Sequence, residues 1–377
     1  SYLARALKRQ PDHLLTLEML AECFERANEL EARDHTIERI HSLKSCAQKV
    51  SSDSSEHSNA QAGEITSGTA SIEKKEDASI PLVTAIVSTY CSEIYMRGCL
   101  DNLLRQTLGQ RLEIIVIDSG SPEKEGHIVQ EYQRQHSNIR YIRTEKRETV
   151  YEAWNRGVNA ARGKYVVNAN TDDGHRKDAF ESLAQCLEAN PKASLAYGDI
   201  VYTTKANDTF PSEHVTRQIH YPEFHPGLAF ACCFAGCTQF WRRDDLIRVG
   251  CFDASYKAAG DYEILLRAVQ HGLSSVHIPE ELSLHYFNEN GITFGPETKQ
   301  LSLDEAQRAR QDYVNRLDIG ALYNEPNASS QRRADLWCDL GDFFYQYKAP
   351  WEMENPKHGI ENLNFVVHCV KKALEEN

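Results

Sequence analysis

From Pro81 onward, short runs of apolar and β-branched residues alternate with segments that have the apolar spacing of amphipathic helices. The expected strands cover residues 83–89, 112–117 and 139–142 and a run that begins at Lys164, and the expected helices cover residues 93–106, 124–136 and 150–161. A chain that alternates in this way forms a largely parallel sheet with helices on both faces. The pattern therefore predicts an α/β fold with a mostly parallel central sheet.

Polar residues stand where three of these strands end. They are Thr89-Tyr90, Asp118 and Asp172-Asp173. In open α/β sheets, ligands bind outside the carboxyl ends of the strands. Two adjacent carboxylates at such an edge can hold a hard cation, and the cation can hold a diphosphate. An alternative is that Asp172 or Asp173 caps a helix expected over residues 176–189.

The first strand is followed by Ser88-Thr89-Tyr90-Cys91-Ser92-Glu93, which contains no glycine. The chain therefore lacks the G-x-G-x-x-G turn that places a helix on a dinucleotide pyrophosphate, and it lacks a P-loop. A nicotinamide oxidoreductase is disfavoured. A nucleotidyltransferase remains an alternative, although it would need a basic, glycine-rich phosphate loop after the first strand.

The chain of 377 residues has a formal net charge of −13, which argues against nucleic acid or an anionic membrane as the main partner. No apolar run is long enough to span a bilayer, and no signal peptide opens the sequence. Its 11 cysteines are scattered and odd in number, as is typical of reduced thiols. We expect a cytoplasmic protein and leave peripheral binding to the inner membrane face open.

The segments on either side of residues 81–300 have other compositions. Residues 1–44 have helical apolar spacing and resemble about one unit of a tetratricopeptide repeat, which implies a protein partner. Residues 45–80 are rich in Ser, Glu, Gly and Lys and poor in large apolar residues, so we expect a disordered linker. Residues 301–377 are expected to be helical.

Four segments in order resemble family 2 of the inverting nucleotide-sugar glycosyltransferases. They are TAIVSTYCSE, EIIVIDSGS, TVYEAWNRGVNAARGKYVVNANTDDGH and FWRRDDLIRVGCFDASYKAAGDYEILLRAVQHG. The resemblance implies a GT-A fold and transfer of a sugar, with inversion, from a nucleotide-sugar donor to an acceptor hydroxyl. It also implies Mg²⁺ or Mn²⁺ as the cofactor and UDP as the expected nucleotide. The acceptor would be a glycan, a lipid-linked group or a protein.

The resemblance also implies roles for individual residues, each with an alternative structural explanation. The catalytic base would be Asp261, unless this residue only caps the helix that follows it. The acceptor or sugar side would include Gly260 and Trp241, although the tryptophan is equally compatible with the core. The residues expected at the donor are Thr89, Tyr90, Glu93, Asp118 and Asp172, and those expected at the metal are Asp173, Asp172 and His285.

Three positions depart from the family pattern. The family's Asp-Asp-Gly-Ser reads Asp118-Ser119, the first acid of its D-x-D triplet reads Asn170, and its Glu-Asp pair reads Gly260-Asp261. These losses keep a further alternative open, namely a non-catalytic helical-repeat scaffold with a degenerate transferase core.

Overall fold

The structure, a computed structural model, describes residues 80–236, 238–346, 365, 366, 368–373, 375 and 376. The tetratricopeptide-like segment and nearly all of the expected linker lie outside the described residues. The chain divides into two compact units, Ala78–Asn327 and a second unit made of Ser1–Asp77 with Ala328–Asn377.

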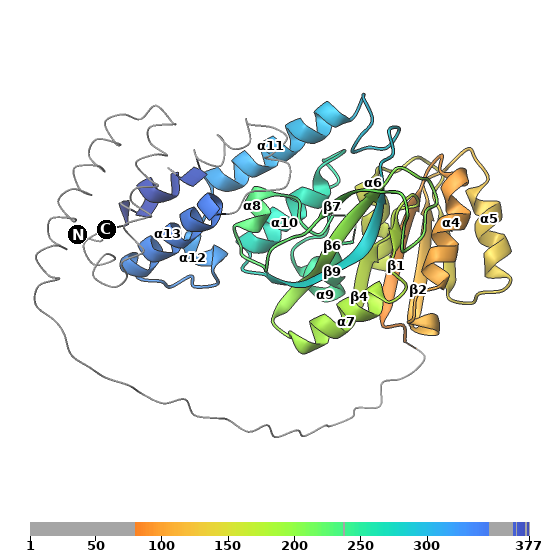
Figure 1. Ribbon diagram of the computed structural model, residues 1–377, viewed down its shortest axis with the longest axis horizontal. Coiled ribbons are helices and arrows are strands. Elements are labelled where there is room, and N and C mark those ends of the chain that lie inside the picture. Colours follow the sequence, from red (N-terminus) through yellow and green to blue (C-terminus); the bar gives the residue numbers. More distant parts are fainter. Residues whose placement is uncertain (1–79, 237, 347–364, 367, 374, 377) are drawn as a thin grey trace, which may run out of the picture. The chain divides into compact units, whose positions relative to one another are not determined.

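The first unit contains strands and helices in alternation (Figure 1). The strands are β1 (Val83–Thr89), β2 (Leu112–Asp118), β3 (Ile139–Arg143), β4 (Tyr165–Asn168), β5 (Gly174–His175), β6 (Ala193–Thr203), β7 (Val215–Ile219), β8 (Phe240–Arg242) and β9 (Ser274–Tyr286). The helices are α4 (Glu93–Leu104), α5 (Glu125–Gln133), α6 (Val150–Ala160), α7 (Ala179–Ala189), α8 (Leu228–Ala231), α9 (Arg243–Arg248), α10 (Gly260–Gln270), α11 (Lys299–Asn315) and α12 (Ile319–Leu322), with a short 3₁₀ turn at Gly109–Arg111.

All the described strands belong to one sheet in the order β3-β2-β1-β4-β8-β6-β9-β5, with β7 added beside β6. Strands β1 to β4 are parallel, and β6 and β9 are parallel to each other. The short strand β8 is antiparallel to both of its neighbours, β4 and β6. The expected α/β fold with a mostly parallel sheet is confirmed.

Both faces of the sheet are covered by helices. On one face, apolar residues of α4, α5 and α7 pack on β1, β2 and β4 in a single core. On the other face, α6 lies against β1 so closely that a Cβ at Gly157 would stand 2.3 Å from Ile86. All seven residues of β2 are buried, as expected for a strand of a parallel sheet between two helix layers.

Local features differ from the sequence expectations at several points, as α7 and the strand pairing show. Helix α7 begins at Ala179 rather than at residue 176. The long strands β6 and β9, which pair over most of their length, were not expected as a pair. None of the helices in the described residues combines the length and the apolar character that a membrane crossing needs.

The described part of the second unit is helical. Helix α13 (Ser330–Gln346) packs its aromatic residues on the helical residues near the end of the chain: Phe344 lies 4.5 Å from Phe365, between ring centroids. Arg333 forms an ion pair with Glu376 at 2.8 Å.

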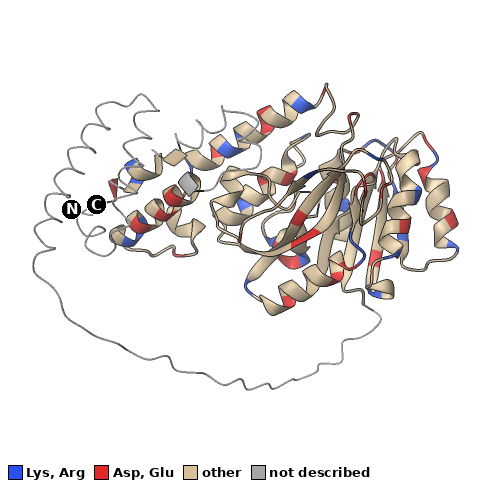
Figure 2. Ribbon diagram, in the orientation of Figure 1, with Lys and Arg blue, Asp and Glu red and all other residues tan. Residues whose placement is uncertain are grey.

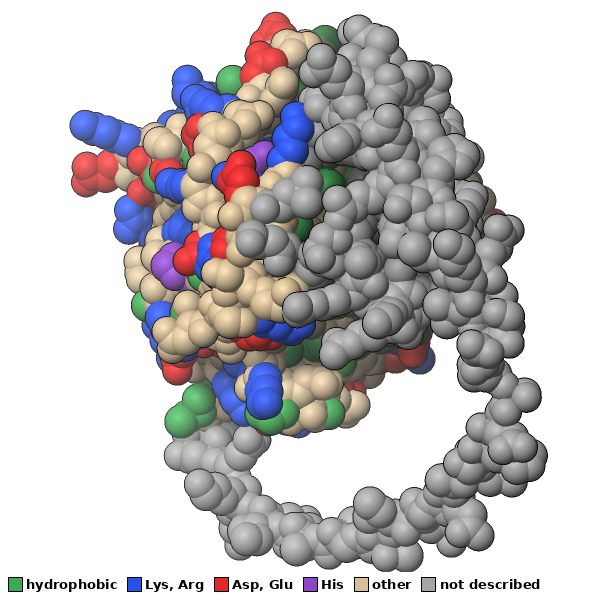
Figure 3. All heavy atoms as spheres, turned by 90° about the vertical axis from the view of Figure 1, so that its left-hand side faces the viewer, with side chains coloured by type: hydrophobic (Ala, Val, Ile, Leu, Met, Phe, Trp, Pro, Cys, Tyr) green, Lys and Arg blue, Asp and Glu red, His purple; other side chains and the backbone are tan. Residues whose placement is uncertain are grey.

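The described surface carries both signs of charge. Figure 2 shows acidic and basic residues along both α4 and α5. On the face drawn in Figure 3, acidic and basic side chains of the described residues are also intermixed.

Candidate active site

The acid pair Asp172-Asp173 lies between β4 and β5. The Asp173 Oδ1 accepts a hydrogen bond from the Tyr286 N–H at 3.1 Å, and its Oδ2 accepts one from the Asn170 amide at 2.9 Å. The Asn288 amide donates to the Asp172 Oδ2 at 2.8 Å. The end of β9 and the residues after it therefore hold both acids. Neither acid caps α7, which begins at Ala179, so that alternative is wrong.

The environment of this pair suits a divalent cation. Burial, and then the charge of Asp173, raise the pKa of Asp172 to about 6. Burial lowers the pKa of His285 to about 4 against the opposing effect of Asp172, so this imidazole is neutral near pH 7. A cation would relieve the repulsion between the carboxylates, and neutral imidazole and carboxylate oxygens are common metal ligands. The chemistry of these side chains thus fits a cation, although the described residues contain no group of three or more His, Cys, Asp or Glu that could hold a metal ion.

The carboxyl end of β2 forms a closed network. Asp118 is fully buried: its Oδ1 accepts from the Ser121 N–H at 2.7 Å, and its Oδ2 accepts from the Tyr141 hydroxyl and the Arg143 guanidinium. Three donors thus hold this carboxylate in place. The expected contact of Asp118 with the donor stays a prediction, and its observed role is to fix the turn after β2.

Two further residues expected at the donor also form hydrogen bonds within the protein. The Thr89 hydroxyl donates to the buried Glu125 carboxylate at 3.4 Å, and Glu93 accepts from the Lys124 N–H at 3.1 Å. Tyr90 differs, because its ring makes a cation–π contact: the Arg147 guanidinium lies 4.1 Å from the ring centroid. Sequence reasoning missed Arg147, which stands in the loop between β3 and α6.

Asp261 lies in the first turn of α10. Its Oδ1 accepts from the Tyr151 hydroxyl at 3.2 Å and from the Tyr262 N–H at 3.0 Å. At Oδ2, the contact is the Cys233 thiol at the long distance of 3.9 Å. Burial raises the pKa of Asp261 above its ordinary value, against the opposing effect of the Tyr151 hydroxyl. The N-cap of α10 is Ala259, with no side-chain cap bond, so the interpretation of Asp261 as the N-cap is wrong.

A short segment before β8 connects the acid pair with Asp261. The hydroxyl of Thr238 lies 3.5 Å from Nδ1 of His175, in the strand that follows the acid pair. The side chain of the next residue, Gln239, donates to the backbone oxygen of Asp261 at 2.8 Å. Two consecutive residues thus contact the strand that follows Asp172-Asp173 and the backbone of Asp261. The acid pair and Asp261 therefore belong to one region of the unit.

Comparisons with known proteins point to one class of enzyme. Residues 84–250 match the family model described as Glycosyl transferase family 2. The uncharacterized glycosyltransferase EpsJ of Bacillus subtilis (strain 168) is 29% identical over 267 residues, which are 68% of this chain and 74% of EpsJ. The chondroitin synthase of Escherichia coli is 29% identical over 205 residues, which are 53% of this chain and 29% of the synthase. The chain is a glycosyltransferase.

The fold of this glycosyltransferase is also found in solved structures. The S. aureus TarS 1–349 structure in complex with UDP-GlcNAc superposes with a TM-score of 0.53 at 17% identity, covering 76% of this chain and 81% of that one. At this identity the likeness shows the GT-A fold and no more. The findings favour the transferase over the scaffold and nucleotidyltransferase alternatives.

The glycine of the altered Glu-Asp pair has a packing reason in this glycosyltransferase. A Cβ at Gly260 would stand 2.9 Å from two atoms of the Tyr151 ring. That ring cannot easily move, because it is buried and packs on Trp154 and Phe252 with centroid distances of 5.4 and 6.2 Å. Tyr151 thus occupies the space next to Gly260 and at the same time donates to Asp261.

Replacing Gly260 is expected to destabilise the glycosyltransferase. Gly260→Ala places a methyl group against the Tyr151 ring, and overpacking of this kind costs about 1–3 kcal/mol of unfolding free energy. The loss should appear as a lower midpoint in denaturant unfolding. Gly174→Ala is the control, because its Cβ would make ordinary contacts of 3.6 Å or more. Equal midpoints for the two variants would contradict the packing explanation.

The expectation for Trp241 is corrected. Its side chain lies in β8 with the residue only 2% exposed, and its indole N–H donates to Gln239 at 3.2 Å. A ring buried to this extent cannot stack on a sugar or an acceptor. The alternative that Trp241 belongs to the core is the correct one.

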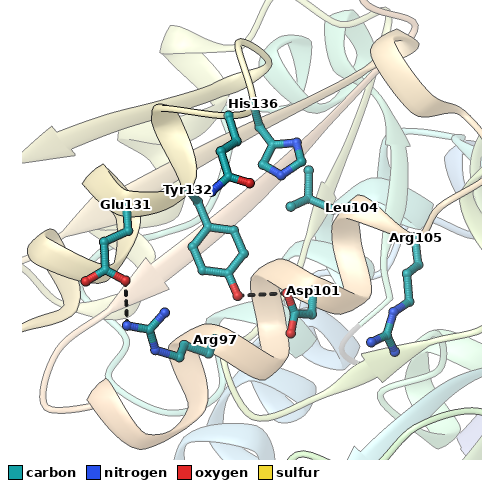
Figure 4. A pocket seen from close by; sticks show the side chains of 8 residues that line it. Arg97, Asp101, Leu104, Arg105, Glu131, Tyr132 and His136 are labelled. Carbon is teal, nitrogen blue, oxygen red and sulfur yellow. Dashed lines mark hydrogen bonds and ion pairs between the residues drawn. The ribbon is translucent and has the colours of Figure 1, made fainter.

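A pocket of about 480 Å³ lies elsewhere, between the outer surfaces of α4 and α5 (Figure 4). Its polar groups largely satisfy one another: Arg97 pairs with Glu131 at 2.6 Å, and the Tyr132 hydroxyl donates to Asp101 at 2.7 Å. None of the residues expected at the active site lines it, so we assign it no part in the transfer reaction.

Proposed function

We propose that this glycosyltransferase moves a sugar from a nucleoside diphosphate donor, with UDP as the nucleotide, to an acceptor hydroxyl with inversion. The observation that carries the proposal is the state of the Asp261 carboxylate. One oxygen is anchored by two donors, while the other has, among the described residues, a weak thiol contact. A carboxylate held in this way is oriented and still able to accept a proton.

The proposed reaction is a single displacement. The acceptor oxygen forms a bond to the anomeric carbon, its proton passes to the Asp261 Oδ2, and the bond between the anomeric carbon and the diphosphate oxygen breaks. The nucleoside diphosphate leaves with the electron pair of that bond. Attack from the face opposite the leaving group inverts the configuration at the anomeric carbon.

The donor side of the proposal rests on the carboxyl ends of β1 and β4. We assign Tyr90, with Arg147 above its ring, to the nucleobase and ribose, together with the neighbouring Thr89, Glu93 and Asp118. Asp173 and Asp172 would hold Mg²⁺ or Mn²⁺, with His285 beside them. Such an ion supplies positive charge to the diphosphate oxygens when the donor is bound.

UDP is proposed because the TarS structure with the same fold holds UDP-GlcNAc. The identity of the sugar and of the acceptor is left to experiment, and glycan, lipid-linked and protein hydroxyls all suit the proposed chemistry. A protein partner of residues 1–44 also stays a prediction.

The proposal is tested by nucleotide release from a panel of UDP- and GDP-sugars with Mn²⁺, followed by NMR of the product formed on a small hydroxyl acceptor. We expect release from a UDP-sugar and the opposite anomeric configuration in the product. Release from none of the donors would contradict the transfer function, while a product of unchanged configuration would contradict inversion.

The pH dependence of turnover should report on Asp261. A general base works only when deprotonated, and burial raises the pKa of this carboxyl. Activity is therefore expected to fall as the pH decreases through a value above the ordinary aspartate pKa of about 3.9. The measurement is kcat against pH, with circular dichroism at each pH to confirm that the chain stays folded. A folded enzyme with constant kcat down to pH values near 4 would contradict this assignment.

A further inference from the structure

The segment that leads into α10 is held by a side chain of another helix. The backbone N–H groups of Lys257, Ala258 and Ala259 all donate to the carboxylate of Glu305, at distances from 2.8 to 3.1 Å. Glu305 belongs to α11 and is only 5% exposed. The three donors belong to the N-cap residue Ala259 and the two residues before it, so a distant acid holds the backbone that leads into the helix.

Helix α11 holds α10 at further points. The Tyr313 hydroxyl donates to Glu263 at 2.6 Å, and the Gln270 side chain donates to the backbone oxygen of Tyr313 at 3.1 Å. The contacts thus reach the segment before α10, its first turn and its last residue. Helix α10 cannot shift along its axis without breaking several of these bonds.

The Glu305 contacts have a direct consequence for Asp261. Hydrogen bonds from several N–H groups to one carboxylate are charge-assisted and stronger than neutral ones, so they fix the backbone that enters α10. Asp261 stands two residues after the last of these donors. Because these bonds fix the backbone just before Asp261, they also restrict where its carboxylate lies beside the Tyr151 hydroxyl.

We propose that Glu305 is a positioning residue for the catalytic base, acting through the backbone of residues 257–259. The proposal rests on the role proposed above for Asp261. It assigns a part in the reaction to a helix outside residues 84–250, the stretch that matches the family model.

The first experiment compares Glu305→Ala and Glu305→Gln with wild type. A small misplacement of a reacting group can cost about 100-fold in rate, so we expect kcat to fall about 10- to 100-fold for the alanine variant. The glutamine variant should fall less, because its amide oxygen can still accept. The KM for the UDP-sugar should stay unchanged in both variants. Asp304→Asn is the matched control, since this neighbouring acid is exposed and its bond among the described residues is to Gln300 within α11.

The second experiment combines Glu305→Gln with Asp261→Asn. If Glu305 acts through the base, its substitution should lower kcat in the wild-type background and have almost no further effect once the base is gone. Equal losses in both backgrounds, or a loss accompanied by weaker UDP binding, would overturn the proposal. Should the alanine variant fail to fold, the glutamine variant decides. Normal turnover in Asp261→Asn alone would instead refute the function proposed for Asp261.

Discussion

Asp261→Asn is expected to lower kcat by about 10²- to 10⁴-fold, which is the usual contribution of general-base catalysis. An alkyl hydroxyl is a weak nucleophile near neutral pH, and the asparagine side chain cannot take its proton. The amide oxygen can still accept from the Tyr151 hydroxyl and the Tyr262 N–H, the two donors to Oδ1. The melting temperature and the affinity for UDP should therefore stay close to those of wild type.

The measurement is turnover at saturating donor, together with calorimetric UDP binding and thermal unfolding. Asp244→Asn serves as the control, because the Asp244 side chain is 96% exposed in α9. Turnover of Asp261→Asn within a few-fold of the control would show that another group takes the proton. A large loss of UDP affinity would show that Asp261 belongs to the donor side instead.

Asp173→Asn is expected to weaken metal-dependent binding of UDP strongly. Loss of an outer-shell partner of a metal ligand already costs about 10- to 100-fold in affinity, and loss of a direct ligand should cost more. The substitution removes one of two adjacent carboxylates, and the amide oxygen that replaces it carries no charge. It also removes the negative charge that helps to raise the pKa of Asp172.

Calorimetric titration of UDP with Mn²⁺, and again with EDTA, measures the effect. Asp178→Asn is the control. Asp178 follows β5 in the sequence, whereas the acid pair precedes β5, and Asp178 forms an ion pair with Arg176. We expect the Mn²⁺-dependent part of the affinity to be lost in Asp173→Asn alone. Unchanged affinity with Mn²⁺ would exclude Asp173 as the ligand.

The first half of the sheet could be predicted from sequence because its signals are local. A buried parallel strand has a continuous apolar run, and β1 covers the expected residues 83–89. The position of Asp172-Asp173 after a strand follows from the same run. Strand β9 gives a weaker signal, since it contains Pro279, Glu280 and Glu281, and its pairing with β6 is interrupted by register shifts there.

The partners of the site residues could not be predicted in this way. Tyr151 reaches Asp261 across 110 positions of sequence, and Asn288 reaches Asp172 across 116. Helical or strand periodicity reports on near neighbours and carries no information about such distant contacts. The same holds for Gly260: the sequence shows a lost acid, whereas the structure shows a position next to the Tyr151 ring.

The contacts between α11 and the segment before α10 limit how far this enzyme can be truncated and remain active. A chain that stopped at residue 300 would keep every strand of the sheet, the acid pair and Asp261, but it would lack Glu305. Such a shortened enzyme would lack the carboxylate that accepts from the backbone N–H groups of residues 257–259, close to its base. We expect it to bind UDP and to turn over poorly, and an inactive fragment of this length would say little about the chemistry of the intact chain.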